Sequence, residues 1–279
     1  CLDNETSGAC SSSSLLFRII GLFDEEYSTN GTSSAGTKKL LKILDTNNYG
    51  GTSGKYWNQT KTSGKNLNDW STATLKTELN GTYLSTLLAT SGVNSKLSSA
   101  IVKAKWHLGG SNSTSGSNYY NDTITIENWY KAERSPYATI GTLQNLFDGN
   151  PEYVFAKVGL MYPSDYGYAT VGGTTKNKSS CRAKELYNWK DSSYSDCKNN
   201  DWLFTSQNNF VNDAEWLLSP CSSYSYFAAA LSRAGYVDLN NSSTGSSQFA
   251  VRPTFYLDSS VLKIVGTGDG TKDNAYRVG

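Results

Sequence analysis

Apolar runs near both ends of the chain are the feature that most limits its possible folds. One run covers residues 15–23, a second covers 38–45, and a third covers 251–265. Short apolar runs between polar turns are typical of buried strands. We expect 15–23 and 38–45 to form an antiparallel pair, and 251–265 to pair with 15–23. This pairing would bring the two chain ends together and predicts a single α+β domain with a mostly antiparallel sheet.

Helical spacing of apolar residues is clearest between residues 75 and 88. Asp69 or Ser71 can cap the start of this helix, and Gly81 divides it into two short pieces. A second amphipathic piece covers 93–110, so two helices are expected.

Later segments indicate strands and loops. Residues 152–170 form an apolar, strand-like run that ends in a tyrosine-rich loop. The last third of the chain contains five further strand-like segments, from "AEWLLSP" to "VLKIVG".

Five cysteines divide by spacing into two local pairs and one single residue. Cys1 and Cys10 enclose one polar loop, and Cys181 and Cys197 enclose another. Both loops are too polar to be core, so we expect two disulfides, a free Cys221 and an oxidising compartment. An alternative for Cys1 is the lipidated first residue of a bacterial lipoprotein, followed by a polar tether.

Composition favours a loop-rich extracellular protein. The chain has 279 residues, 19 tyrosines and only 18% charged residues. Its formal net charge of +1 makes nucleic acid a poor partner. No apolar run approaches the roughly 20 residues that cross a bilayer.

One polar segment, residues 221–247, lies between apolar flanks and contains no Lys, Glu, Gln, Met or Trp. Tyrosines offer rigid contact area, and serines and asparagines offer adaptable hydrogen bonds, as in antibody paratopes. The flanking strands would fix the backbone beneath them. The expected ligand-binding residues are Cys221, Ser222, Ser223, Tyr224, Ser225, Tyr226, Ser232, Arg233, Ala234, Tyr236, Asp238, Asn240, Asn241, Ser242 and Ser243. Arg252 in "VRP" is expected to make internal hydrogen bonds.

Ordered blocks along the chain carry a resemblance: "FRIIGLF", "NDWSTATLKTELN", "WHLGG", "GLMYPSDYGYAT", "EWLLSP" and "VRPTFYL". They resemble a family of bacterial surface proteins of unassigned activity, many of them pilin-like. The closing part is similar to the C-type-lectin-fold variable proteins of diversity-generating retroelements. The resemblance implies a C-type-lectin-like fold, similar also to the formylglycine-generating-enzyme fold. Domain 15–279 would follow a cysteine loop at 1–14, and a missing N-terminal segment would attach it to a pilus or envelope.

The resemblance also implies a reason for the composition of residues 221–247. These retroelements mutate template adenines, so an AAC codon becomes a codon that ends in C. Such codons cannot encode Lys, Glu, Gln, Met or Trp, and the segment lacks the same five types. An ordinary polar loop is the alternative.

Catalytic and metal chemistry have little support in the sequence. His107 is the single histidine, and its apolar setting indicates a structural role. Asp24, Glu25 and Glu26 are interpreted as a solvated acidic turn. Cys221 is single, whereas the oxidase chemistry of the related fold needs paired cysteines. Calcium-lectin tripeptides are absent, so no metal and no cofactor are expected.

These observations predict a non-enzymatic binding protein on a bacterial surface. Its variable region, residues 221–247, would contact a protein or glycan on another cell, a phage or a matrix. The alternative is a structural, pilin-like surface subunit without a diversified site. An enzyme on the related fold is a third, weaker hypothesis.

Overall fold

The computed structural model describes residues 1–5, 7–59, 66–111, 124–135, 139–140, 143–207, 209–239 and 244–278. Its main sheet contains β1 (Phe17–Ser28), β2 (Gly36–Asp45), β4 (Lys103–His107), β7 (Tyr153–Ala156), β8 (Val158–Gly159) and β13 (Thr254–Asp258). Their order is β7-β4-β1-β2-β13-β8, and neighbouring strands are antiparallel. The architecture is therefore α+β.

The two edges of this sheet come from one segment. Lys157 alone separates β7 from β8, yet these strands lie at opposite ends of the strand order. The sheet therefore curves round until its edges meet, and side chains on its concave side become enclosed.

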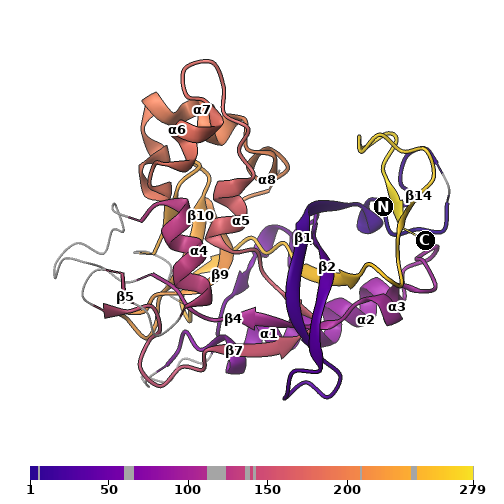
Figure 1. Ribbon diagram of the computed structural model, residues 1–279, viewed down its shortest axis with the longest axis horizontal. Coiled ribbons are helices and arrows are strands. Elements are labelled where there is room, and N and C mark those ends of the chain that lie inside the picture. Colours follow the sequence, from indigo (N-terminus) through magenta and orange to yellow (C-terminus); the bar gives the residue numbers. More distant parts are fainter. Residues whose placement is uncertain are drawn as a thin grey trace.

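The expected antiparallel pair of 15–23 and 38–45 is confirmed as β1 and β2, which lie side by side in Figure 1. The expected pairing of 251–265 with 15–23 is wrong. β13 pairs with β2 instead, with Tyr256 opposite Lys42. β1 cannot take β13 as its neighbour because it already pairs with β2 and β4.

A second sheet of three strands lies beside the first. It consists of β9 (Ala214–Pro220), β10 (Ala228–Ser232) and β11 (Val237–Asp238), in the order β11-β10-β9. Three small pairs complete the strands: β3 (Lys55–Tyr56) with β12 (Gln248–Phe249), β5 (Thr139–Ile140) with β6 (Leu143–Gln144), and β14 (Ile264–Val265) with β15 (Arg277–Val278).

Helices are short and more numerous than the two expected. The α-helices are α1 (Thr74–Glu78), α2 (Leu84–Leu88), α3 (Leu97–Ala100), α4 (Ile126–Arg134), α5 (Pro163–Tyr168), α6 (Lys178–Arg182), α7 (Ser195–Asn199) and α8 (Trp202–Thr205). The 3-10 turns are η1 (Ser13–Leu15), η2 (Gly51–Ser53), η3 (Trp70–Thr72), η5 (Leu186–Lys190) and η6 (Ser192–Tyr194). Side-chain caps such as Asn177 and Asp201 start two of these short helices.

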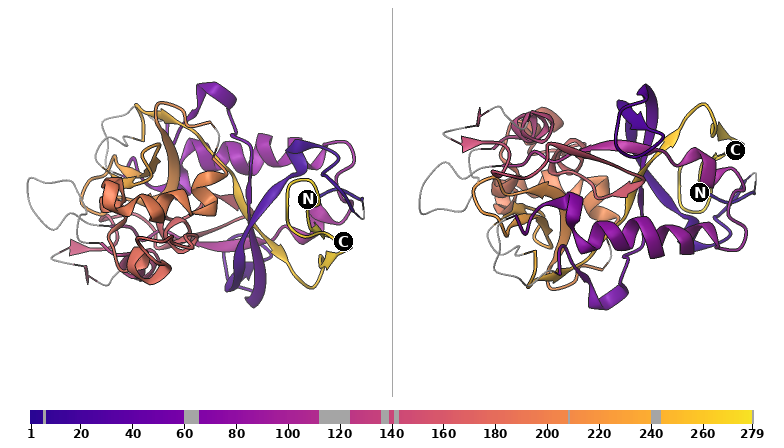
Figure 2. Two further views of the ribbon diagram at one scale, coloured as in Figure 1. Left: turned by 90° about the horizontal axis from the view of Figure 1, so that it is seen from above. Right: turned by 90° about the horizontal axis from the view of Figure 1, so that it is seen from below.

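The helix expected at 75–88 is present, and a π-helical turn, η4 (Leu79–Tyr83), joins α1 to α2 at Gly81. Asp69 caps the preceding turn η3. Figure 2 shows this helical run along one side of the main sheet. The amphipathic helix expected over 93–110 is wrong beyond α3, because alternating burial makes 103–107 strand β4. The expected tyrosine-rich loop is α5, which Pro163 and Asp165 begin.

Two groups of buried side chains form the core. One lies between the main sheet and the helical run, and the other between the second sheet and helices α4 to α8. Gly109 and Gly110 follow β4, where the backbones of three segments come close together. A Cβ at Gly110 would lie 1.7 Å from the carbonyl oxygen of Pro220, and one at Gly109 would lie 2.0 Å from that of Ala132. Only glycine allows this approach of three backbones.

The two chain ends meet, as expected. The amino group of Cys1 donates to the carbonyl of Tyr276 at 2.7 Å, and Arg277 pairs with Asp3 at 2.8 Å. Both termini lie at the end of the molecule opposite α6 and α7 (Figure 1). The Cys1–Cys10 and Cys181–Cys197 disulfides are confirmed, and Cys221 is free.

Candidate ligand-binding surface

The polar segment 221–247 does not form one continuous surface. Its middle is β10, in which residues 228–231 are buried. Residues 222–227, which we call the tyrosine loop, precede this strand, and residues 232–236, the hairpin turn, follow it. Because a strand rises about 3.3 Å per residue, the loop and the turn are separated by roughly 15 Å. The expected binding residues therefore divide between two ends of β10.

The tyrosine loop is held by the buried side chain of Asn68. Its amide nitrogen Nδ2 lies 2.8 Å from the carbonyl oxygen of Cys221 and 2.9 Å from those of Tyr224 and Phe227. The backbone N–H of Asn68 donates to the Ser225 carbonyl at 2.7 Å. One residue from a different part of the chain thus fixes the loop backbone without using the loop's side chains.

Further hydrogen bonds support these contacts of Asn68 with the loop carbonyls, which we call the Asn68 clamp. Asn150 donates from Nδ2 to the Asn68 side-chain oxygen at 3.0 Å, which fixes the orientation of the amide. The backbone N–H of Thr244 donates to the Tyr226 carbonyl at 2.9 Å, and Asn58 in turn donates to the Thr244 carbonyl at 2.9 Å. The loop backbone is therefore preorganised.

Three aromatic rings gather on the loop. The Tyr226 ring lies 4.4 Å from the Phe227 ring and 6.0 Å from the Tyr224 ring, centroid to centroid. Tyr226 is 38% exposed, whereas Tyr224 and Phe227 are half-buried. An amphipathic ring that is already supported by neighbouring rings loses little side-chain entropy when it binds a partner. Ser223 and Ser225 are half-buried beside this cluster.

Two expected contact residues are buried. Cys221 is 3% exposed and Ser222 is 7% exposed, because both continue from β9 into the core. Burial raises the pKa of the Cys221 thiol, whose sulfur lies 3.3 Å from the Ser223 hydroxyl oxygen. These two residues therefore support the loop and do not face a ligand.

The hairpin turn is exposed at its tip. Arg233 and Ala234 face solvent, and Arg233 Nε pairs with Asp213 at 3.0 Å. Lys198 Nζ donates to the Ala234 carbonyl at 2.7 Å, and Gly235 adopts the left-handed φ of +81° that closes the turn. Arg233 also lines a shallow hollow of about 600 Å³ with the rings of Phe204 and Phe210.

The remaining expected residues lie on either side of the turn or outside the described residues. Ser232 and Asp238 are half-buried at strand ends. Tyr236 is half-buried, with its ring 5.6 Å from that of Tyr187. Asn240, Asn241, Ser242 and Ser243 lie outside the described residues.

The expected acidic turn at Asp24, Glu25 and Glu26 is wrong, because these residues belong to strand β1 and pair with β2, and Glu25 lies beside His107. His107 Nε2 lies 3.4 Å from Glu25, and Arg134 approaches the same carboxylate at 3.4 Å. Burial raises the pKa of Glu25, but the hydrogen bond from His107 and the charge of Arg134 outweigh it, and the net pKa is lowered. The interpretation of Glu25 as solvated is therefore wrong, since the curved sheet encloses it, whereas Asp24 is exposed and pairs with Lys39.

Arg252 makes the internal hydrogen bonds that its apolar setting predicted. Its guanidinium forms two bonds to Glu215, at 2.8 and 2.9 Å, and further bonds to the Ser206 hydroxyl and the Leu203 carbonyl. Both charged side chains are fully buried. The pair joins β9 to α8 and is not part of a ligand surface.

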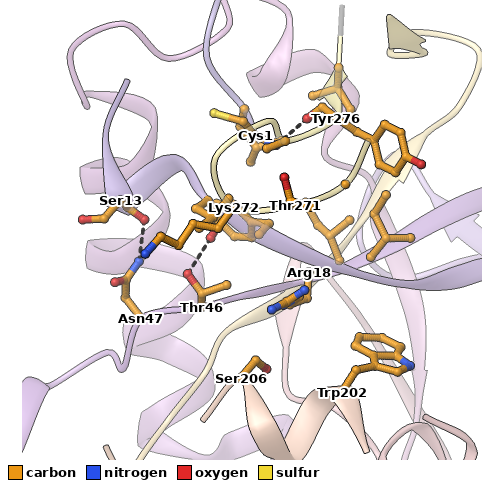
Figure 3. Close-up of a pocket in the computed structure, with 18 of the residues that line it drawn as sticks. Cys1, Ser13, Arg18, Thr46, Asn47, Trp202, Ser206, Thr271, Lys272 and Tyr276 are labelled. Carbon is orange, nitrogen blue, oxygen red and sulfur yellow. Dashed lines mark hydrogen bonds between the residues drawn. The ribbon is translucent and has the colours of Figure 1, made fainter. Parts of the chain in front are cut away.

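A cavity that the sequence analysis did not anticipate lies near the chain ends. It has a volume of about 510 Å³ and apolar walls that include Phe17, Leu41 and Ile43. Arg18 enters it from β1, and Lys272 extends across it toward Asn47 (Figure 3). No local pattern signals this cavity, because segments from both ends of the chain form it.

Within the described residues, no helix is long and apolar enough to cross a membrane. Comparisons with protein-family models, with curated proteins and with solved structures found no match to this chain.

Proposed function

We propose that this chain is an extracellular, non-enzymatic binding protein of a bacterial surface, of the kind that diversity-generating retroelements vary. The tyrosine loop would contact a protein or glycan on another cell, a phage or a matrix, and the hairpin turn would form a second contact. The fold would be of the C-type-lectin-like class. The observation that carries this proposal is the Asn68 clamp, which fixes the loop backbone independently of its side chains.

A diversified site needs this separation of backbone from side chains. If loop side chains held the loop in place, most substitutions there would also unfold it. Here the hydrogen bonds of Asn68 reach only main-chain carbonyls of the loop. Tyr226 and Ser225 can change while the carbonyls stay in position, and each new side chain is presented on the same frame.

Binding assays on a glycan array and on a panel of bacterial cells and phage particles would test the proposal. Tyr226→Ala is expected to weaken any detected binding roughly tenfold or more, as loss of an aromatic anchor does. Tyr153 on β7 offers a matched control, since it is 40% exposed and lies on a different sheet. Tyr153→Ala should bind like the unaltered protein. Equal binding by the Tyr226→Ala variant would contradict a role for the loop.

The alternative is a structural, pilin-like subunit whose polar loops only face solvent. A nearly identical non-coding copy of the 221–247 coding region beside the gene, with adenines at the varied positions, would favour the binding protein. Absence of such a copy from a complete genome, together with no binding on either panel, would favour the structural subunit.

A further inference from the structure

Lys42 is a fully buried lysine in the middle of the main sheet. It lies on β2 opposite Gly21 of β1 and Tyr256 of β13, and its side chain is 0% exposed. Its Nζ atom lies 2.5 Å from Oδ2 of Asp165, whose side chain is 3% exposed. Asp165 belongs to the first turn of α5 and is separated from Lys42 by 123 residues.

Four aromatic rings enclose the amine. Nζ lies 4.3 Å from the ring centroid of Tyr162, 5.3 Å from that of Tyr256 and 5.4 Å from that of Trp106. Phe23 adds a fourth ring at 5.7 Å, and this ring packs over Gly21, where a Cβ would lie 3.1 Å from it. The pair therefore lies in a site from which aromatic carbon excludes water.

An ion pair is poorly satisfied in this enclosure. Within the described part of the chain, Asp165 is the one hydrogen-bond acceptor of Nζ, although an ammonium group has three hydrogens to donate. Burial lowers the pKa of the Lys42 amine, and the charge of Asp165 opposes that shift. Burying two charges with so few hydrogen bonds is costly, and transfer of one proton from Nζ to Oδ2 along their hydrogen bond converts the pair into a neutral amine and a neutral acid.

We propose that Lys42 and Asp165 condense into an intramolecular isopeptide bond. The lone pair of the neutral Lys42 Nζ attacks Cγ of the protonated Asp165 carboxyl group and forms the new C–N bond. The C–O bond to the carboxyl hydroxyl then breaks, and that hydroxyl leaves with one amine hydrogen as water. Neither an oxidant nor a co-reactant is needed, and two buried charges are replaced by a neutral amide.

The neighbours of Asp165 hold it for this reaction. Its Oδ2 also accepts the backbone N–H of Tyr162 at 2.7 Å. Glu133, fully buried on α4, accepts from the Ser164 N–H at 3.0 Å and from the Ser164 hydroxyl at 2.5 Å. These bonds fix the first turn of α5 against the sheet, and Glu133 is thus a positioning residue.

The polar atoms of the enclosing rings differ in their hydrogen bonding. Trp106 donates to the Ala156 carbonyl and Tyr162 to that of His107. The hydroxyl of Tyr256 is buried and has no hydrogen-bond partner among the described residues. The cross-link would also restrict the unfolded chain over 123 residues.

Intact-mass spectrometry of the denatured, fully reduced protein tests this inference. The expected mass is one water lower than the sequence requires, and proteolysis should give one branched peptide that contains both Lys42 and Asp165. The full mass in a folded sample, with the two peptides unlinked, would overturn the proposal. Because the first reading uses the unaltered protein, the test does not depend on whether a variant folds.

Variants locate the bond. Lys42→Arg and Asp165→Ala should each restore the full mass. Lys38 pairs with Asp258 at 2.7 Å but is 37% exposed, which makes it a matched lysine–aspartate control. Lys38→Arg should keep the deficit of one water, and loss of the deficit in that variant would place the bond elsewhere and contradict the assignment.

Discussion

The two ends of β10 carry similar residue types but differ in what holds them. At the tyrosine loop, the buried Asn68 binds three main-chain carbonyls. At the hairpin turn, the backbone depends on its own Gly235, with φ of +81°, and on Lys198. A loop whose support comes from outside can vary its side chains freely. A turn whose conformation also depends on one of its own residues, here Gly235, must keep that residue fixed.

The largest expected effect is at the clamp. Asn68→Ala leaves buried carbonyls without donors, so the free energy of unfolding should fall by about 3 kcal/mol. Urea denaturation measures this as a lower midpoint at an unchanged slope. Asn4 is an exposed asparagine that also bonds to two carbonyls, and Asn4→Ala should change stability by less than about 0.5 kcal/mol. Equal effects at the two asparagines would mean that the hydrogen bonds of Asn68 do not hold the tyrosine loop in place.

A smaller loss is expected at the turn. A Cβ at Gly235 would lie 2.5 Å from the Lys198 side chain, and its positive φ is unfavourable for alanine. Gly235→Ala should cost about 1–2 kcal/mol. Gly81 provides a control of opposite sign, because it is helical and has no neighbour within 4 Å. Gly81→Ala should stabilise the protein by roughly 0.5–1 kcal/mol in the same denaturation assay.

The smallest effects on stability are expected at the exposed tips. Tyr226→Ala and Arg233→Ala should each change the free energy of unfolding by about 0.5 kcal/mol or less. Arg233 pairs with Asp213 where both side chains are mostly exposed, so water screens the pair. Thermal melting would measure both variants. A loss at Tyr226 as large as that at Asn68 would mean that the ring holds the loop, contrary to our account.

Short sequence patterns correctly predicted one strand pair, both disulfides and the internal hydrogen bonds of one arginine. The apolar runs gave the β1–β2 pair, and cysteine spacing gave both disulfides. The isolated Arg252 within an apolar segment predicted internal hydrogen bonds. The strand pair and the disulfides join residues that are close in the sequence. Arg252 differs, because burial of its charge is so costly that a hydrogen-bonding partner has to be present.

Contacts between segments that are distant in the sequence could not be predicted from local patterns. "NDW" identifies Asp69 as a cap but gives no sign that Asn68 reaches residues more than 150 positions away. The partner of β13 depends on which edge of β2 is free, and the burial of Cys221 depends on the length of β9. Lys42 looks like an ordinary strand lysine until the curved sheet encloses it with Asp165.

The central claim is that exposed positions of 221–247 vary on a fixed frame, and sequencing this gene from many isolates of one lineage tests it most directly. We predict that substitutions concentrate at codons for exposed or half-buried positions such as Tyr226, Arg233 and Ala234. The buried strand residues 228–231 and the clamp Asn68 should stay unchanged. Substitutions spread evenly along the gene, or as frequent at 228–231 as at Tyr226, would contradict the account.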